Sequence, residues 1–284
     1  MAISNLRELR DAEKKSSWKT FHSKVPSQVT TAGVWFDLNM SPGNPKPFYY
    51  ASSPGEAAIL SSSLGGIFHG GLVTPYKKYL TRFLTKAISA TGLPINFILL
   101  DYLMYYPFID MSDTSLQELT NNVSLPRSTT GEGVKIMAVL AAAGAGGQTF
   151  QITYTNSAGV SGRQTVVTIM NTATAIGSII SSQTANASAS GAFLPLQSGD
   201  SGVRSIESVQ MISGSDVGLF NLVLVKPITN TCVLEITAPV EKDLYAEKGF
   251  VPEIEDGAYL NFICMPQGSL SGLRLFFELL FCWG

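Results

Sequence analysis

Alternation of apolar and polar residues is the clearest pattern in the second half of the chain. In residues 149–155, Phe150, Ile152 and Tyr154 alternate with polar neighbours, which is typical of a strand with one buried face. Turn-forming residues 156–159 follow, and residues 165–170 resume with β-branched side chains. This pattern predicts an antiparallel hairpin.

Further short strands are predicted between this hairpin and the end of the chain, each bounded by Gly, Pro, Asn, Asp or Ser. In the last of them, Leu273, Leu275, Phe277, Leu279 and Phe281 share one face. About seven short strands at such spacing predict an antiparallel, jelly-roll-like β-sandwich over residues 128–284. The additional strands are predicted at residues 203–212, 219–226, 232–237, 258–265 and 273–282.

The N-terminal residues predict a capped helix followed by an irregular arm. Asn5 and Glu8 form a capping box for a short, highly charged helix. Residues 25–50 contain four prolines, which argue against a regular helix or a central strand. The interpretation is an extended arm over residues 1–50 that lies on other surfaces.

Helical spacing dominates the stretch after the arm. Residues 74–92 predict a helix with Thr74 as its N-cap and apolar side chains on one face. An apolar run follows at residues 95–106, and another short helix is predicted to begin at Asp113. Residues 51–127 are therefore expected to form a helical or mixed region, and the expected fold class is α+β.

Charge is scarce along the chain. Charged residues make up 14% of it, whereas an average soluble domain has about 25%. Residues 138–199 carry a single formal charge, that of Arg163. The centres of protein interfaces are poor in charge and rich in aromatic residues, so the arm and this charge-poor segment are predicted to contact other chains. The candidate interface residues are Trp35, Phe36, Phe48, Tyr49, Tyr50, Phe150, Ile152 and Tyr154.

Composition argues against several classes of protein. A hydrophobic fraction of 45% and a net charge of −2 do not fit disorder, and 19 basic residues balanced by 21 acidic ones do not fit a nucleic-acid binder. The apolar run at residues 94–108 is short for a membrane span and contains Asp101. The polar N-terminus predicts retention in the cytosol. Cys232, Cys264 and Cys282 match no metal-site spacing and are expected to be small buried hydrophobes.

One serine motif suggests hydrolytic chemistry, but its partners are missing. Residues 199–202, Gly-Asp-Ser-Gly, resemble the nucleophile motif of chymotrypsin-like proteases, which needs a histidine base and an orienting aspartate. The only histidines are His22 and His69, and neither lies in the sequence context of that family. A tight turn before a strand at Val203 explains the motif better.

Other candidate sites also have structural explanations. The glycine-rich residues 143–147 lack the Gly-Lys-Ser/Thr of a phosphate loop and fit a hairpin tip or a link between domains. Glu253, Glu255 and Asp256 fit a solvated turn, and aromatics at residues 102–108 fit core packing. His69 is expected to have a structural role in a loop. We expect no enzymatic activity, cofactor, metal or small-molecule substrate.

Four stretches of the chain resemble virion structural proteins of tailed bacteriophages: residues 35–47, 99–110, 196–206 and 276–284. The resemblance implies a head-associated component that is made in the bacterial cytoplasm and assembled in many copies. It implies contacts with copies of the same chain, for example in a trimer, and with a major capsid protein. It implies neither membrane nor direct nucleic-acid binding.

Size and predicted architecture favour one role within this class, a capsid decoration or cement protein. Shell proteins of tailed phages typically have a long charged spine helix, and the sequence predicts none. A major capsid protein or a tail or baseplate component is the alternative within the structural class. A receptor- or glycan-binding module is the alternative from another class.

Overall fold

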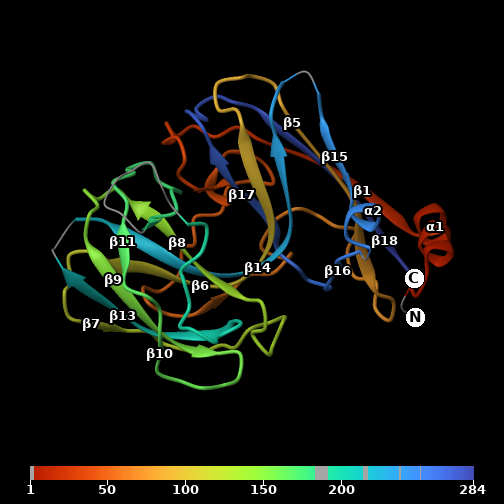
Figure 1. The fold of residues 1–284 in the computed structure, drawn as a ribbon. Helices are drawn as coiled ribbons and strands as arrows, with labels where there is room; N and C mark the ends of the chain where they lie inside the picture. Colours follow the sequence, from red (N-terminus) through yellow and green to blue (C-terminus); the bar gives the residue numbers. More distant parts are fainter. Residues whose placement is uncertain (1–2, 183–190, 214–216, 237, 250) are drawn as a thin grey trace.

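Three six-stranded antiparallel sheets account for most of the regular secondary structure in the described residues (Figure 1). The computed structural model describes residues 3–182, 191–213, 217–236, 238–249 and 251–284. Sheet 1 has the order β15 (Val240–Asp243), β5 (Lys78–Ala87), β18 (Leu275–Trp283), β1 (Ser17–Lys24), β3 (Gly43–Asn44), and β16 (Glu253–Ile254) also pairs with β5. Sheet 2 has the order β2 (Phe36–Asp37), β17 (Leu260–Pro266), β6 (Ile95–Asp110), β14 (Leu219–Val233), β8 (Lys135–Ala142), and β4 (Ala58–Ile59) pairs with β6. Sheet 3 has the order β12 (Ser181–Ser182), β11 (Thr168–Met170), β9 (Thr149–Asn156), β13 (Val203–Ser213), β7 (Leu116–Glu118), and β10 (Arg163–Gln164) pairs with β9.

Sheets 1 and 2 form a sandwich around an aromatic core. The inward side chains of β18 alternate as predicted, and Leu275, Phe277, Leu279 and Phe281 are all buried. They pack in one cluster with Phe83 of β5, and with side chains of β6 and β17 from the opposite sheet. The prediction of an antiparallel sandwich is therefore confirmed, but the sandwich is not confined to residues 128–284, because β1, β5 and β6 also belong to it.

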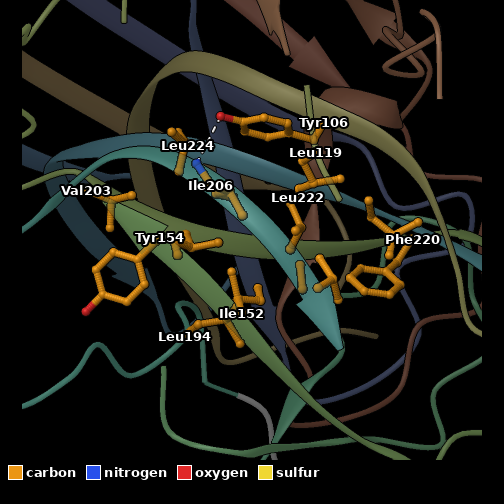
Figure 2. Packing of buried hydrophobic residues seen from close by; sticks show 14 of the residues in the cluster. Tyr106, Leu119, Ile152, Tyr154, Leu194, Val203, Ile206, Phe220, Leu222 and Leu224 are labelled. Atoms are coloured by element: carbon orange, nitrogen blue, oxygen red, sulfur yellow. Dashed lines mark hydrogen bonds between the residues drawn. The ribbon is translucent and has the colours of Figure 1, made fainter. Parts of the chain in front are cut away.

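Sheet 3 is built mainly from residues between β6 and β14, and it packs on the same two long strands at their other ends. β6 has 16 residues and β14 has 15, so each reaches from one core into the next. Phe97 belongs to the core with sheet 1, whereas Tyr106 belongs to the core with sheet 3. Figure 2 shows the second core, where the Tyr106 hydroxyl accepts a hydrogen bond of 3.0 Å from the Ile206 amide.

The helices predicted between residues 74 and 120 are wrong. Residues 78–87 form β5, the apolar run forms β6, and β7 occupies the position of the helix expected after Asp113. In β5 the apolar residues also fit a period of two, because Phe83, Thr85 and Ala87 face inward while Arg82 and Lys86 face solvent. Pairing with β15, β16 and β18 decides between the two periods. The described chain is thus mainly β rather than α+β.

The helices that do form are short. α1 (Leu6–Lys15) begins at the predicted cap, where the Asn5 side chain accepts from the Glu8 amide at 3.0 Å. α2 (Leu244–Lys248) and the 3-10 helix η1 (Leu38–Met40) are the others in the described residues. None of the helices in these ranges has the length and apolar character needed to cross a membrane.

The three predicted regions contribute strands to shared sheets. β1 and β2 from residues 1–50, β5 and β6 from residues 51–127, and β14 and β18 from the remainder pair with one another in sheets 1 and 2. The predicted hairpin is confirmed, because β10 and β11 both pair antiparallel with β9. β14 contains all of the strand predicted at residues 219–226 and the first two residues of the strand predicted at residues 232–237. Residue 237 lies outside the described ranges.

Candidate functional site

The three aromatic and aliphatic residues of β9 that were predicted to contact other chains are internal. Phe150, Ile152 and Tyr154 each have 0% of their surface exposed and pack in the core between sheets 2 and 3. Their alternation therefore marks the buried face of sheet 3. The prediction that these side chains touch another chain does not fit their position.

The arm residues divide into buried and exposed positions. Phe36 and Tyr50 are buried within the chain, Trp35 and Phe48 are half-buried, and Tyr49 alone of the five is 55% exposed. Residues 25–50 lie against their own sandwich, since β2 pairs with β17 and β3 pairs with β1. The arm is thus a strap on its own chain, and Tyr49 is the one candidate that a partner can reach fully.

A buried carboxylate fastens this strap. Asp37 accepts hydrogen bonds from the Tyr50 hydroxyl at 2.6 Å, the Tyr102 hydroxyl at 2.7 Å and the Asn39 amide at 2.9 Å. Burial raises the pKa of Asp37, although these hydrogen bonds and the charge of Lys24 oppose the effect. Lys24 itself is fully buried and donates to two backbone carbonyls of the same strap. This network explains how a proline-rich segment holds one conformation.

A buried ion pair lies beneath a groove between the sheets. Arg127 binds both carboxylate oxygens of Asp101, at 2.8 and 2.9 Å, and also donates to two backbone carbonyls. Asp101 contributes to the wall of a cavity of about 350 Å³, which also contacts Lys226, Glu253 and Glu255. Asp101 accepts hydrogen bonds from Arg127 and from the Tyr259 amide. Its carboxylate is therefore already occupied within the chain and is not free to bind a ligand in the groove.

The Gly-Asp-Ser-Gly motif forms a structural turn. Ser201 donates to Glu132 at 2.6 Å and lies 2.9 Å from the Ser157 hydroxyl. Asp200 accepts from Tyr154 at 2.6 Å and from Arg163 at 2.9 Å. The hydrogen bond from Arg163 is the main cause that lowers the pKa of Asp200 to about 2. The motif therefore ties the loops of sheet 3 together.

The two histidines lie elsewhere, so the motif has no histidine base. His22 is in sheet 1, stacked against the rings of Phe262 and Phe277, with centroids at 5.4 and 4.6 Å, and these two rings also stack on each other at 4.3 Å. His69 is buried beside Lys78 of β5. Among the described residues, no three His, Cys, Asp or Glu side chains gather in a way that could hold a metal ion.

An exposed apolar cluster was not predicted from the sequence. Trp18 and Phe68 meet edge to face with ring centroids 5.2 Å apart, and they are 41% and 55% exposed. Leu72, in the same glycine-rich segment as Phe68, is 80% exposed. The only sequence signal was a pair of Gly-Gly steps, one on each side of Ile67, Phe68 and His69 and the second just before Leu72, and Gly70 brings the backbone close to Trp18.

The charge-poor segment, residues 138–199, has both a buried and an exposed part. Residues 143–147 connect β8 of sheet 2 to β9 of sheet 3, as a link between two sheets. Three valines that follow β9 in the chain are exposed: Val160 by 50%, Val166 by 49% and Val167 by 42%. The segment itself is poor in charge, but Glu207 and Arg204 of β13 bind its loop at Gly162 and Ser157, and Arg163 pairs with Asp200.

Comparisons with known proteins add little to what the geometry shows. No family model matches the chain, and no curated protein matches it. One solved structure with a weak likeness is the crystal structure of an infectious bursal disease virus VP2 subviral particle. The sequences are 9% identical, the match covers 94% of this chain and 80% of that one, and the TM-score is 0.17. A likeness at this level carries no argument about fold or function.

Proposed function

We propose that the chain is a structural subunit of a virus particle that works by contacting other copies of itself or a shell protein. The observation that carries the proposal is the strand order of sheets 1 and 2. Eight strands, taken in chain order, are β1, β2, β5, β6, β14, β15, β17 and β18.

Their pairing follows the double Greek key of a jelly roll. Numbered by their order in the chain, the strands of sheet 1 lie side by side as first, eighth, third and sixth (β1, β18, β5, β15). Those of sheet 2 lie as second, seventh, fourth and fifth (β2, β17, β6, β14). The strands of sheet 3 come from an insertion between the fourth and fifth strands. Jelly rolls of this kind occur in viral capsid domains and in lectins. The strand order supports the proposal by analogy with proteins of similar fold. The exposed side chains of the charge-poor segment are an independent observation.

The exposed valines of the charge-poor segment support an assembly. Val160, Val166 and Val167 are 50%, 49% and 42% exposed, and burial between subunits would remove their apolar groups from water. Within the virion class, the strand order favours a shell-forming subunit over the decoration protein that size and predicted architecture suggested. A bacteriophage source, a place in the head and assembly in the bacterial cytoplasm remain proposals based on that resemblance alone.

The test is whether the purified chain assembles. We expect sedimentation and electron microscopy to show closed particles or large regular oligomers. Val166→Asp combined with Val167→Asp should abolish them while leaving the circular dichroism spectrum unchanged, because both side chains are exposed. Val29→Asp is the matched control, since Val29 is 73% exposed but lies outside the charge-poor segment.

Each alternative gives a different result. A decoration protein would stay a small oligomer and bind preformed shells at stoichiometric copy number. A glycan-binding module would stay small and bind a sugar saturably, with loss of binding when Tyr49 is replaced. A chain that remains monomeric at high concentration and binds neither shells nor itself would refute the proposal.

A further inference from the structure

The segment of residues 66–74, which precedes β5, is held to the sandwich through one buried histidine. His69 has only 2% of its surface exposed. Its Nε2 lies 3.0 Å from the Ala258 carbonyl oxygen, and its Nδ1 lies 2.9 Å from Nζ of Lys78. Both ring nitrogens are therefore engaged.

These two partners fix the protonation state of the ring. A carbonyl oxygen can only accept, so Nε2 of His69 carries the hydrogen. A lysine ammonium can only donate, so Nδ1 of His69 must offer its lone pair. The ring is neutral in this arrangement, and a proton on Nδ1 would set an N–H against the ammonium of Lys78.

The lysine links the histidine to the rest of the segment. The Lys78 side chain is fully buried, donates to the Gly71 carbonyl and lies 3.5 Å from a carboxylate oxygen of Asp256. Asp256 in turn accepts from the Val73 amide at 3.1 Å and from the Thr74 hydroxyl at 2.7 Å. Four residues of the segment thus converge on one buried lysine and one carboxylate.

The segment covers apolar groups of the sandwich end. Ile67 is 2% exposed, and Gly70 lies against the rings of Trp18 and Trp283. Phe68 and Leu72 point outward on either side. Release of the segment would uncover Ile67 and the two indole rings and would free the exposed apolar side chains to move.

We propose that His69 is an acid-sensitive latch, in which protonation of Nδ1 breaks its hydrogen bond with Lys78 and releases residues 66–74 from the sandwich. The charged groups facing the ring are Lys78 from β5 and Asp256 from the turn before β17, while β18 presents the uncharged ring of Phe281 at 6.0 Å. The latch does not depend on the proposed function of the chain.

The electrostatics agree with this geometry. Burial, and after it the charge of Lys78, lowers the pKa of His69 to about 4. Burial alone would raise the pKa of Asp256, but hydrogen bonds from Thr74 and Val73 and the charge of Lys78 lower it overall. Asp256 therefore stays ionised while His69 takes up its proton, and the new positive charge faces Lys78 at short range.

Hydrogen–deuterium exchange of the full chain tests the latch. We expect the opening of residues 66–74, corrected for intrinsic exchange, to increase by at least about tenfold between about pH 7 and about pH 4.5, because the released histidine regains an ordinary pKa. Peptides from β6 (Ile95–Asp110) serve as the internal reference and should change far less. An unchanged segment would overturn the proposal.

Two variants separate the latch from general acid sensitivity. His69→Gln can keep both hydrogen bonds but cannot gain a proton, so the increase should disappear, whereas His22→Phe, at the other histidine, should retain it. If His69→Gln does not fold, Lys78→Met removes the opposing cation and raises the pKa of His69 in the closed state, so the increase between about pH 7 and about pH 4.5 should become smaller. The same pH dependence in His69→Gln, or an undiminished increase in Lys78→Met, would refute the latch.

Discussion

Acid should destabilise the sandwich through His22, which sits in an aromatic stack inside sheet 1. His22 is 5% exposed, and its ring stacks against those of Phe262 and Phe277. Burial, and then the charge of Lys24, lowers the pKa of His22 to about 3 in the folded chain. In the unfolded chain the pKa returns to about 6.5.

The size of the effect follows from this difference. Below about pH 6.5 the unfolded state binds a proton that the folded state does not, so stability falls as the pH decreases and stops falling near pH 3. At 1.36 kcal/mol per pH unit the total loss is about 5 kcal/mol, and about 2 kcal/mol of it is lost between pH 7 and pH 5.

The assay is urea unfolding at pH 7 and pH 5 for the natural chain and for His22→Phe, which keeps the aromatic stack. The free energy of unfolding should fall by about 2 kcal/mol less in the variant, because contributions from His69 and the carboxylates are common to both chains. Ser23→Ala, on the same strand, is the control and should leave the pH dependence unchanged. A difference between the two chains below about 0.5 kcal/mol, or a titration midpoint of His22 near 6.5 by NMR, would refute the reasoning.

Three further substitutions test other parts of the fold. Arg127→Met leaves Asp101 buried and unpaired and should lower the free energy of unfolding by about 3–5 kcal/mol in urea, while adding Asp101→Leu should restore most of it. Gly202→Ala should give little folded protein on expression, because its Cβ would lie 1.9 Å from the Gly131 carbonyl oxygen; a normal melting temperature would contradict this contact. Asn5→Ala should destabilise α1 by about 1 kcal/mol and raise amide exchange in residues 6–15 alone; an unchanged exchange rate would show that the cap contributes nothing.

Local patterns in the sequence predicted the strands that bury only one face and the helix that begins at a capping residue. β9 and β18 each bury one face, so their alternation was visible, and the side chain of Asn5 identified the start of α1. β6 is buried on nearly all sides because β17 and β14 flank it in the middle of sheet 2. A strand of this kind has no alternation and cannot be distinguished from an apolar helix by pattern alone.

The candidate site depended on contacts between residues far apart in the chain. Asp37 meets Tyr102, and Lys78 meets Asp256, only because β2, β5, β6 and the turn before β17 come together in the folded sheets. Aromatic and charge-poor composition was interpreted as a surface that contacts other chains. Composition could not distinguish such a surface from a core, since Phe150 and Val166 lie in the same segment with opposite exposure.

The position of β18 has a consequence for synthesis of the chain. β18 lies between β1 and β5 in sheet 1, although it is the last of these strands to leave the ribosome. At about 5–20 residues per second, roughly 10 to 50 seconds separate the appearance of β1 from that of its partner. During this interval the backbone edges of β1 and β5 that pair with β18 have no partner. Sheet 1 can close only after translation has passed Trp283.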